Sequence, residues 1–274
     1  MVASNAIFNR TTLLLGDEAM EKIAAAKVIL LGVGGVGSWC AESLIRSGIR
    51  HLTMVDSDRV CITNINRQLM ATTKTVGLVK VEALRQRLLD INPAAEICAL
   101  QAIYDKTTAA SFRLDAYDYI VDAIDSLSGK MHLIRTATRT SATFFSSMGA
   151  ALKLDPTRIR VAEFWDVKGC PLAAMLRKRI RRGDLPAKKF LCVYSDEVLE
   201  NKGRNTSCGT ERCLCPKVAN ANADATSEGN PDLAAHEWCS AKAIINGTVA
   251  HTTAIFGFVL AGLVVQNICK KAEQ

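Results

Sequence analysis

The 274-residue sequence lacks the features that mark several other classes of protein. Its first residues contain no charged segment followed by an apolar one, so we expect no secretory signal. No Cys-x-x-Cys pair occurs among its ten cysteines, which argues against a structural zinc ion held by two such pairs. Because 49% of the residues are apolar and only 22% are charged, the composition indicates a globular chain. We expect a cytoplasmic, reducing compartment.

The cysteines and the net charge set weaker limits. Five cysteines in apolar surroundings are predicted to be buried, reduced thiols: Cys40, Cys61, Cys98, Cys192 and Cys269. Zinc ligation is the alternative for four later cysteines, whose spacing suits a tetrahedral site poorly: Cys208, Cys213, Cys215 and Cys239. The net charge of +7 permits contact with nucleic acid but does not require it.

A glycine cluster follows the first strongly apolar run. Val28–Leu31 has the composition of a buried strand, and the residues after Gly37 have the spacing of a helix. Gly32 would allow the turn between them, Gly34 the approach of a phosphate, and Gly37 the packing of helix on strand. The N-terminus of such a helix favours an anion. This unit predicts a nucleotide site, with an unliganded glycine turn as the alternative.

Strands and helices alternate through the rest of the first two thirds. A second strand ends at Asp56, where an acid about 20 residues after the glycines commonly binds a ribose hydroxyl. Further strands are predicted at 96–102, 119–122 and 143–148, and helices at 17–23, 76–91, 107–114 and 128–140. The pattern predicts an α/β, Rossmann-like, doubly wound and mainly parallel sheet with its ligand beyond the carboxyl ends of the strands.

Charged residues accompany these strand ends. Asp122 and Asp125 leave the 119–122 strand, where two carboxylates suit a hard cation that bridges phosphates; capping of the next helix is the alternative. Arg67 follows the acidic strand end, and Lys80 is expected on the polar face of the 76–91 helix. Two cations with Asp125 favour ATP over a nicotinamide cofactor, because phosphoanhydride cleavage requires positive charge.

Together these motifs resemble the ubiquitin-activating (E1-like) superfamily, which includes the adenylating enzymes of molybdopterin and thiamine synthesis. The matching motifs are Gly32-x-Gly34-Gly35-x-Gly37, Asp56-x-Asp58, Asn64-x-Asn66-Arg67-Gln68, Lys80 and Asp122-x-x-Asp125. The resemblance implies a single E1-like domain over 1–274. Its parts would be a nucleotide-binding core at 1–165, a helical and flexible loop region at 166–240, and a segment at 241–274 that completes the core.

The resemblance also implies roles for individual residues. The activity of the superfamily is attack of a carboxylate on the α-phosphorus of ATP-Mg²⁺, with Asp56 on the ribose, Arg67 and Lys80 on the phosphates and Asp125 on Mg²⁺. Arg10 matches an arginine that reaches the triphosphate from the partner subunit, which implies a homodimer. The implied nucleotide-binding set is Gly32, Gly34, Gly35, Val36, Gly37, Asp56, Asp58, Asn64, Asn66, Arg67, Gln68, Lys80, Asp122, Ile124 and Asp125.

Within the superfamily, the chain is most similar to the family of tRNA threonylcarbamoyladenosine dehydratases. The motifs that carry this similarity include Arg10-Thr11-x-Leu13-Leu14-Leu15-Gly16, Met148-Gly149-Ala150 and Cys192-Val193-Tyr194-Ser195-Asp196-Glu197. This family activates the threonyl carboxylate of a modified adenosine in tRNA, and the side chain then cyclises with loss of water. The similarity implies tRNA carrying threonylcarbamoyladenosine as substrate and a sulfur-transfer protein as a candidate partner.

Three segments of the C-terminal third leave alternatives open. Met175–Arg182, with Lys188 and Lys189, is either a solvated helix face or a surface for tRNA phosphates. Residues 201–237 are predicted to form a long flexible loop. Residues 243–269 contain no Asp, Glu, Lys or Arg, and we expect a buried strand and helix there, with membrane association as the alternative.

Three other functions compete with the tRNA cyclase. The first is E1-like adenylation of the C-terminus of a ubiquitin-like or sulfur-carrier protein, against which the missing Cys-x-x-Cys pairs count. The second is a nicotinamide-dependent oxidoreductase, which gives no reason for Arg67, Lys80 and Asp125 to occur together. The third is an idle nucleotide-binding scaffold, which the full set of charged positions disfavours.

Overall fold

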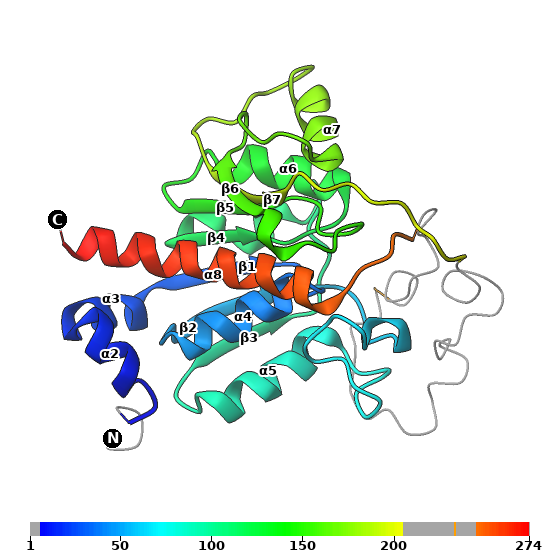
Figure 1. Ribbon diagram of the computed structural model, residues 1–274. Coiled ribbons are helices and arrows are strands. Elements are labelled where there is room, and N and C mark those ends of the chain that lie inside the picture. Colours follow the sequence, from blue (N-terminus) through cyan, green and yellow to red (C-terminus); the bar gives the residue numbers. More distant parts are fainter. Residues whose placement is uncertain (1–5, 205–232, 234–244, 274) are drawn as a thin grey trace.

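The computed structural model describes residues 6–204, 233 and 245–273 of the chain. Strands and helices alternate through most of this part (Figure 1). In chain order the helices and strands are α2 (Asn9–Leu15), α3 (Asp17–Ala25), β1 (Lys27–Leu31), α4 (Gly37–Arg46), β2 (His51–Val55), α5 (Lys80–Ile91), β3 (Glu96–Leu100), β4 (Tyr119–Asp122), α6 (Leu127–Ala137), β5 (Thr143–Ser147), β6 (Ile159–Glu163), α7 (Pro171–Ile180), β7 (Leu191–Ser195) and α8 (Ala250–Ala272).

The strands form one seven-stranded sheet in the order β3-β2-β1-β4-β5-β7-β6. Neighbouring strands are parallel except β6 and β7, which pair antiparallel. The chain proceeds outward from β1 to β3 and then returns to the other side of β1 with β4. Such a reversal leaves a ligand crevice at the carboxyl ends of the strands. The predicted Rossmann-like, mainly parallel sheet is confirmed.

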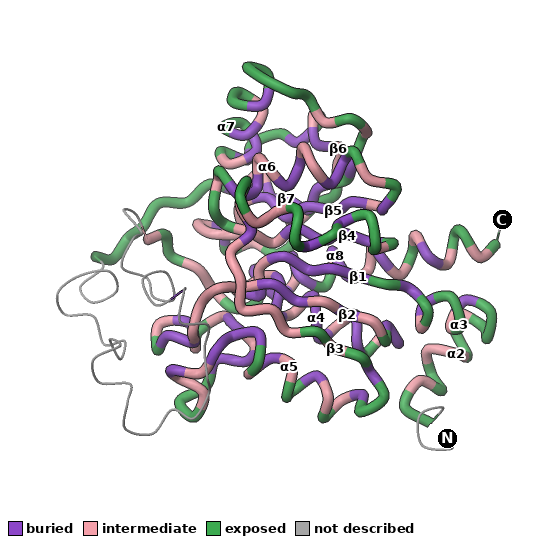
Figure 2. The backbone as a smooth tube through the Cα atoms, turned by 180° about the vertical axis from the view of Figure 1, so that it is seen from behind, coloured by how far each residue is buried: buried purple, intermediate pink, exposed green. Residues whose placement is uncertain are grey.

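Alternate residues of the central strands enter two separate cores. Val28 and Leu30 of β1 pack with α3, α4, α5 and α8, whereas Ile29 and Leu31 pack on the opposite face with α6 and α7. Successive side chains of a strand point to opposite faces, so a strand covered on both faces requires a continuous apolar run. Figure 2 shows the central strands almost wholly buried.

Helix α8 packs along the face of the sheet that α3 and α4 also cover (Figure 1). Its contact with α4 is close: a Cβ on Gly257 would lie 2.4 Å from Val36 O and 2.8 Å from Cys40 N. Among the described residues, α8 is the helix long and apolar enough to cross a membrane, and 50% of its most apolar window is buried. A strand was expected in 243–269 together with this helix, but the described residues 245–249 form none.

Some predicted boundaries and environments differ from the structure. The 76–91 helix begins at Lys80, and the 107–114 segment forms only the short 3₁₀ turns Ala109–Phe112 and Leu114–Ala116. The 166–240 region supplies β7, which lies inside the sheet, and therefore contributes more than helix and loop. Two of the cysteines predicted to be buried are not fully so. Cys98 is exposed, because it lies on β3 at the edge of the sheet, and Cys269 is half-buried.

Several predictions fall on residues that the structure does not describe. The 201–237 loop lies almost entirely outside the described residues, as do Cys208, Cys213, Cys215 and Cys239. The alternatives for these cysteines stay predictions.

Candidate active site

The glycine turn between β1 and α4 lies at the carboxyl edge of the sheet, next to the reversal of strand order. Gly32 has a φ of +89°, and a Cβ on Gly37 would lie 1.8 Å from Gly32 O. Only glycine at position 37 therefore lets α4 begin this close to the turn. A Cβ on Gly34 would meet nothing nearer than Gln68 Nε2 at 3.8 Å, so the turn is open on that side.

Asp56 directly follows β2 and lies at one end of this turn. Its Oδ2 accepts a hydrogen bond of 2.8 Å from Val33 N, and its Oδ1 accepts one of 2.9 Å from Asp58 N. Burial raises the pKa of Asp56, against the attraction of Lys80, which lowers it. The carboxylate is thus held beside the glycine turn, at the position expected for an acid that binds a ribose hydroxyl.

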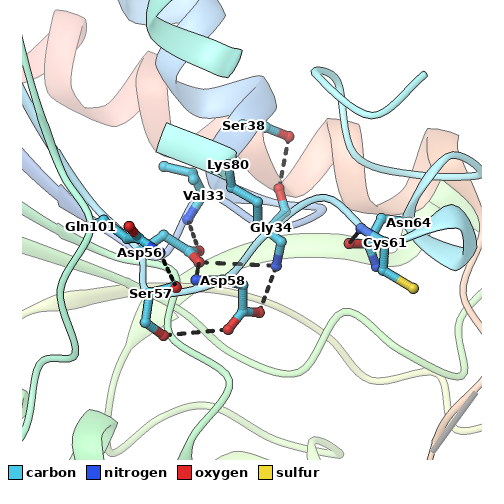
Figure 3. A network of polar contacts seen from close by, with 10 residues as sticks. All are labelled: Val33, Gly34, Ser38, Asp56, Ser57, Asp58, Cys61, Asn64, Lys80 and Gln101. Atoms are coloured by element: carbon cyan, nitrogen blue, oxygen red, sulfur yellow. Dashed lines mark hydrogen bonds and ion pairs between the residues drawn. The ribbon is translucent and has the colours of Figure 1, made fainter. Parts of the chain in front are cut away.

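Lys80 is the buried cation of the site. Its Nζ lies 2.6 Å from Asp58 Oδ2 and 4.0 Å from Asp56 Oδ1 (Figure 3). Burial alone would lower the pKa of Lys80, but the carboxylates of Asp56 and Asp58 raise it above its ordinary value, so the amine stays charged. The sequence places Lys80 on the polar face of its helix, yet its side chain is only 6% exposed, because it lies against Asp58 and Asp56.

A closed loop brings Lys80 to the acidic strand end. Arg59 and Val79 form an isolated antiparallel bridge, and Lys80 N donates to Asp58 O at 3.0 Å. Residues 59–79 therefore leave the strand end and return to it. Because of this return, two residues far apart in sequence become neighbours at the mouth of the crevice.

Arg67 lies within that loop and against the glycine turn. Trp39 Nε1, on the first turn of α4, donates to Arg67 O at 3.0 Å. The guanidinium Nη1 donates to Thr63 O and to Asn66 Oδ1. A Cβ on Gly35 would lie 3.4 Å from Arg67 Cγ. A second positive charge is therefore fixed beside the N-terminus of α4.

Gln68 carries a buried polar atom that fits a ligand bound at the glycine turn. The residue is 6% exposed, and its Oε1 has no hydrogen-bond partner among the described residues. Buried amide atoms are normally paired. Because Gln68 borders the open side of the glycine turn at Gly34, a ligand bound there could supply the partner, to either end of the amide.

Two asparagines of the same loop have structural contacts. Asn64 Oδ1 accepts from Cys61 N at 3.1 Å, and Asn66 Nδ2 donates to Thr248 O at 3.0 Å. The contact of Asn64 holds the shape of the loop, and the contact of Asn66 joins the loop to the segment before α8.

Asp122 and Asp125 have different environments, although both were expected to face the crevice. Asp122 is fully buried; its Oδ2 lies 2.6 Å from Lys130 Nζ and accepts from Ser146 Oγ at 2.6 Å. The prediction that Asp122 contacts the ligand or its cation is therefore not supported by the geometry, because this carboxylate is already neutralised below the site. Asp125 is exposed, and its charge helps to raise the pKa of Lys80.

The alternative of helix capping is also resolved. Ser126 is the N-cap residue of α6 and accepts from Gly129 N, whereas Asp122 Oδ1 accepts from Ile124 N at 3.0 Å. The side chain of Asp122 thus fixes the turn that carries Ile124 and Asp125 rather than the helix end.

Lys130 is a contributor that the sequence analysis missed. It is 1% exposed, and its Nζ donates to Ser147 O at 2.9 Å besides its contact with Asp122. It thereby joins the carboxyl ends of β4 and β5 beneath the crevice. A lysine eight residues after a strand-end aspartate carries no local signal, because the pairing depends on how α6 packs.

Arg10 does not join this group within one chain. It is exposed on α2, which contacts α3, and α3 leads into the amino end of β1. The glycine turn follows the other end of that strand, so α2, which carries Arg10, lies toward the opposite edge of the sheet (Figure 1).

The chemistry that these residues allow is the binding of a charged nucleotide. Asp56 offers an acceptor for a ribose, while Lys80, Arg67 and the N-terminus of α4 offer positive charge for phosphates. The described residues contain no group of three or more metal-ligating side chains. Asp125 fits Mg²⁺ nevertheless, since this ion is usually held by one or two carboxylates together with substrate phosphates.

Known proteins are similar to this chain over most of its length. The tRNA threonylcarbamoyladenosine dehydratase of Bacillus subtilis is 40% identical over 190 residues, which cover 69% of this chain and 74% of that protein. The Escherichia coli enzyme of the same name is 32% identical over 97% of this chain and 95% of its own length. The crystal structure of E. coli tRNA N6-threonylcarbamoyladenosine dehydratase, TcdA, in complex with ATP superposes with a TM-score of 0.79 at 29% identity, covering 99% of this chain and 97% of that one. The ThiF family profile matches residues 8–274, and the chain belongs to the ThiF family.

Proposed function

We propose that this chain catalyses the ATP-dependent dehydration of threonylcarbamoyladenosine in tRNA, through an acyl-adenylate of the threonyl carboxylate. The observation that carries the proposal is the charged, buried Lys80 between Asp56 and Asp58, at the open side of a glycine turn. Such a cation suits the negative charge of a triphosphate. The similarity to dehydratases over almost the whole chain favours this substrate over a carrier protein.

The reaction has two steps that need no protein nucleophile. In the first, an oxygen of the threonyl carboxylate attacks the α-phosphorus of ATP, and pyrophosphate leaves. In the second, a nitrogen or oxygen of the same side chain attacks the activated carbonyl carbon and loses its proton. AMP then leaves with the carboxylate oxygen, so the nucleoside has lost one water in total.

The side chains of the site would bind and orient the nucleotide during these steps. Asp56 would accept from the ribose, and Arg67 and Lys80 would neutralise phosphate charge beside the N-terminus of α4. Asp125 would hold Mg²⁺, and the ion would offset the negative charge of the phosphates. The backbone turn at Ile124, held by Asp122, would keep Asp125 in place.

We also propose that the active form is a homodimer in which Arg10 reaches the site of the partner subunit. Arg10 lies away from the crevice of its own chain, and α2 has no buried residue. Leu13 and Leu14 of α2 are 79% and 81% exposed, an arrangement that suits burial against a second copy. A cytoplasmic location, and a sulfur-transfer protein as a further partner, are expectations from the family alone.

The experiment that tests this function measures AMP and the nucleoside in one reaction. The purified protein is incubated with ATP, Mg²⁺ and tRNA that carries or lacks threonylcarbamoyladenosine, and the digested tRNA is weighed by mass spectrometry. We expect AMP, and loss of one water from the nucleoside, only with the modified tRNA. AMP formed only with a carrier protein ending in Gly-Gly would replace the proposed substrate with the protein substrate of the alternative function.

A further inference from the structure

A cleft of about 630 Å³ lies along the outer side of α7, apart from the nucleotide site. Five cations line it together with one aromatic residue: Lys168, Arg177, Lys178, Arg181, Arg182 and Trp165. No acidic residue lines it. Its lining residues come from the loop before α7, from α7 itself and from the two residues after that helix. It extends the basic segment predicted from sequence, because Lys168 and Trp165 come from the loop before the helix.

The five cations of the cleft lie together without a carboxylate to offset their charge. Within the described part of the chain, none of the five forms an ion pair. Elsewhere, Arg46 and Arg87 both contact Glu42, and Arg139 contacts Asp184. Lys188, expected from the sequence to extend the basic surface, instead donates to Thr140 O and Ala142 O. Five uncompensated positive charges therefore lie together in the cleft, where they favour a polyanion.

Two of the arginines are held in place before any ligand binds. Arg177 Nη1 donates to Phe164 O at 3.0 Å, and the Arg181 guanidinium lies 5.3 Å from the centroid of the Trp165 ring. Positions 177 and 181 are one turn apart on α7 or its C-cap, about 6 Å along the axis. Arginines fixed in this way present planar donors to successive phosphates at a reduced entropic cost.

One end of the cleft reaches the edge of the sheet where the nucleotide binds. Gly169, which lines the cleft, packs against Asp196, directly after the carboxyl end of β7. β5 and β7 are parallel neighbours, and β4 with Asp122 lies beside β5. A long ligand could therefore lie in the cleft while another part of it enters the crevice.

We propose that this cleft binds the phosphate backbone of RNA, and that it holds the tRNA while the modified nucleoside reaches the adenylation site. The inference rests on the proposed function for the identity of the RNA. Three observations support the proposal. Five cations without a carboxylate partner line the cleft, two of its arginines are held in place, and one end of the cleft reaches the edge of the sheet that carries the crevice.

The test compares two variants that lose equal charge. One combines Lys178→Ala, Arg181→Ala and Arg182→Ala, all exposed residues of the cleft. The control combines Lys74→Ala, Lys106→Ala and Lys270→Ala, exposed lysines that also lack a carboxylate partner but lie elsewhere. Affinity for tRNA carrying threonylcarbamoyladenosine is measured by filter binding over a range of salt concentrations, and thermal unfolding checks that each variant is folded.

We expect the cleft variant to bind tRNA at least about tenfold more weakly, with a salt slope lower by up to about 3, because each lost phosphate contact lowers the slope by about 1. Its KM for tRNA should rise, while its affinity for ATP stays that of the wild type. Unchanged tRNA affinity, or an equal loss in the control variant, would overturn the proposal. Weaker tRNA binding without any dehydration by the wild type would refute the proposed function and leave the RNA cleft standing.

Discussion

Lys80 Nζ and Asp58 Oδ2 are 2.6 Å apart, although the residues are separated by a loop that leaves β2 and returns. Lys80 is almost fully buried, whereas the Asp58 side chain is 38% exposed, so the pair spans from the core to the mouth of the crevice. The lysine is thereby charged and oriented before nucleotide arrives. A preorganised cation of this kind stabilises developing charge without reorganising during the reaction.

Replacing Lys80 or Asp125 should impair adenylation for different reasons. Lys80→Met removes the buried cation, and we expect AMP formation to fall by about 10²–10³-fold. It should also lower stability, because Asp56 and Asp58 lose their partner. Asp125→Asn should reduce AMP formation while the unfolding temperature stays unchanged, because Asp125 is exposed. Full turnover by either variant would remove that residue from the site.

Two glycines of the same turn should respond differently to alanine. Gly37→Ala places a methyl group 1.8 Å from Gly32 O and should destabilise the fold by at least the upper end of the ~1–3 kcal/mol typical of overpacking. Gly34→Ala meets nothing within 3.8 Å and should unfold like the wild type, yet bind ATP more weakly. Urea denaturation and calorimetric ATP titration measure the two effects. Normal ATP binding by Gly34→Ala would show that phosphates do not approach there.

The raised pKa of Asp56 predicts an acid limit on nucleotide binding. The ribose requires the ionised carboxylate, and burial moves protonation of Asp56 to a pH above the ordinary value of about 3.9. ATP affinity should therefore fall as pH decreases through the raised pKa. The Asp56→Asn variant should bind ATP more weakly at neutral pH, and its affinity should not fall further through this pH range. This difference separates the titration of Asp56 from that of ATP itself. Parallel pH profiles for both proteins would exclude Asp56 as the cause.

The placement of Arg10 predicts complementation between inactive variants. Arg10→Ala and Asp125→Ala should each be nearly inactive alone. If Arg10 acts across the dimer, mixing them yields mixed dimers with one intact site, and part of the activity returns. A mixture of Lys80→Met and Asp125→Ala is the control, since both changes lie within one subunit's site and no mixed dimer has an intact one. No recovery in the first mixture would place Arg10 outside the partner's site.

The sequence was most informative where function depends on neighbouring residues. The run from Val28 to Asp56 predicts a strand, turn, helix and strand because each glycine and apolar residue acts locally, and the structure confirms this unit. The doubly wound sheet follows from the alternation of such units. The role of Gly37 in helix packing also agrees with the 1.8 Å approach to Gly32 O.

Pairings across long sequence distances could not be predicted in the same way. Lys80 is a polar residue by type, and only closure of the 59–79 loop shows that it is buried between carboxylates. From sequence alone Asp122 has the features of a cation ligand. In the folded chain, α6 places Lys130 Nζ 2.6 Å from the Asp122 carboxylate, which is therefore already paired. The close approach of Gly257 to Val36 could not be predicted either, because it depends on how α8 crosses α4.

The most direct test of the account follows the oxygen atoms of the substrate. tRNA is prepared with a heavy oxygen isotope in both oxygens of the threonyl carboxylate, and the AMP released during a single turnover is analysed by mass spectrometry. If the carboxylate attacks the α-phosphorus of ATP, one heavy oxygen is transferred to AMP and the other stays in the cyclised nucleoside. Dehydrated nucleoside accompanied by unlabelled AMP would contradict the acyl-adenylate and with it the proposed chemistry of this site.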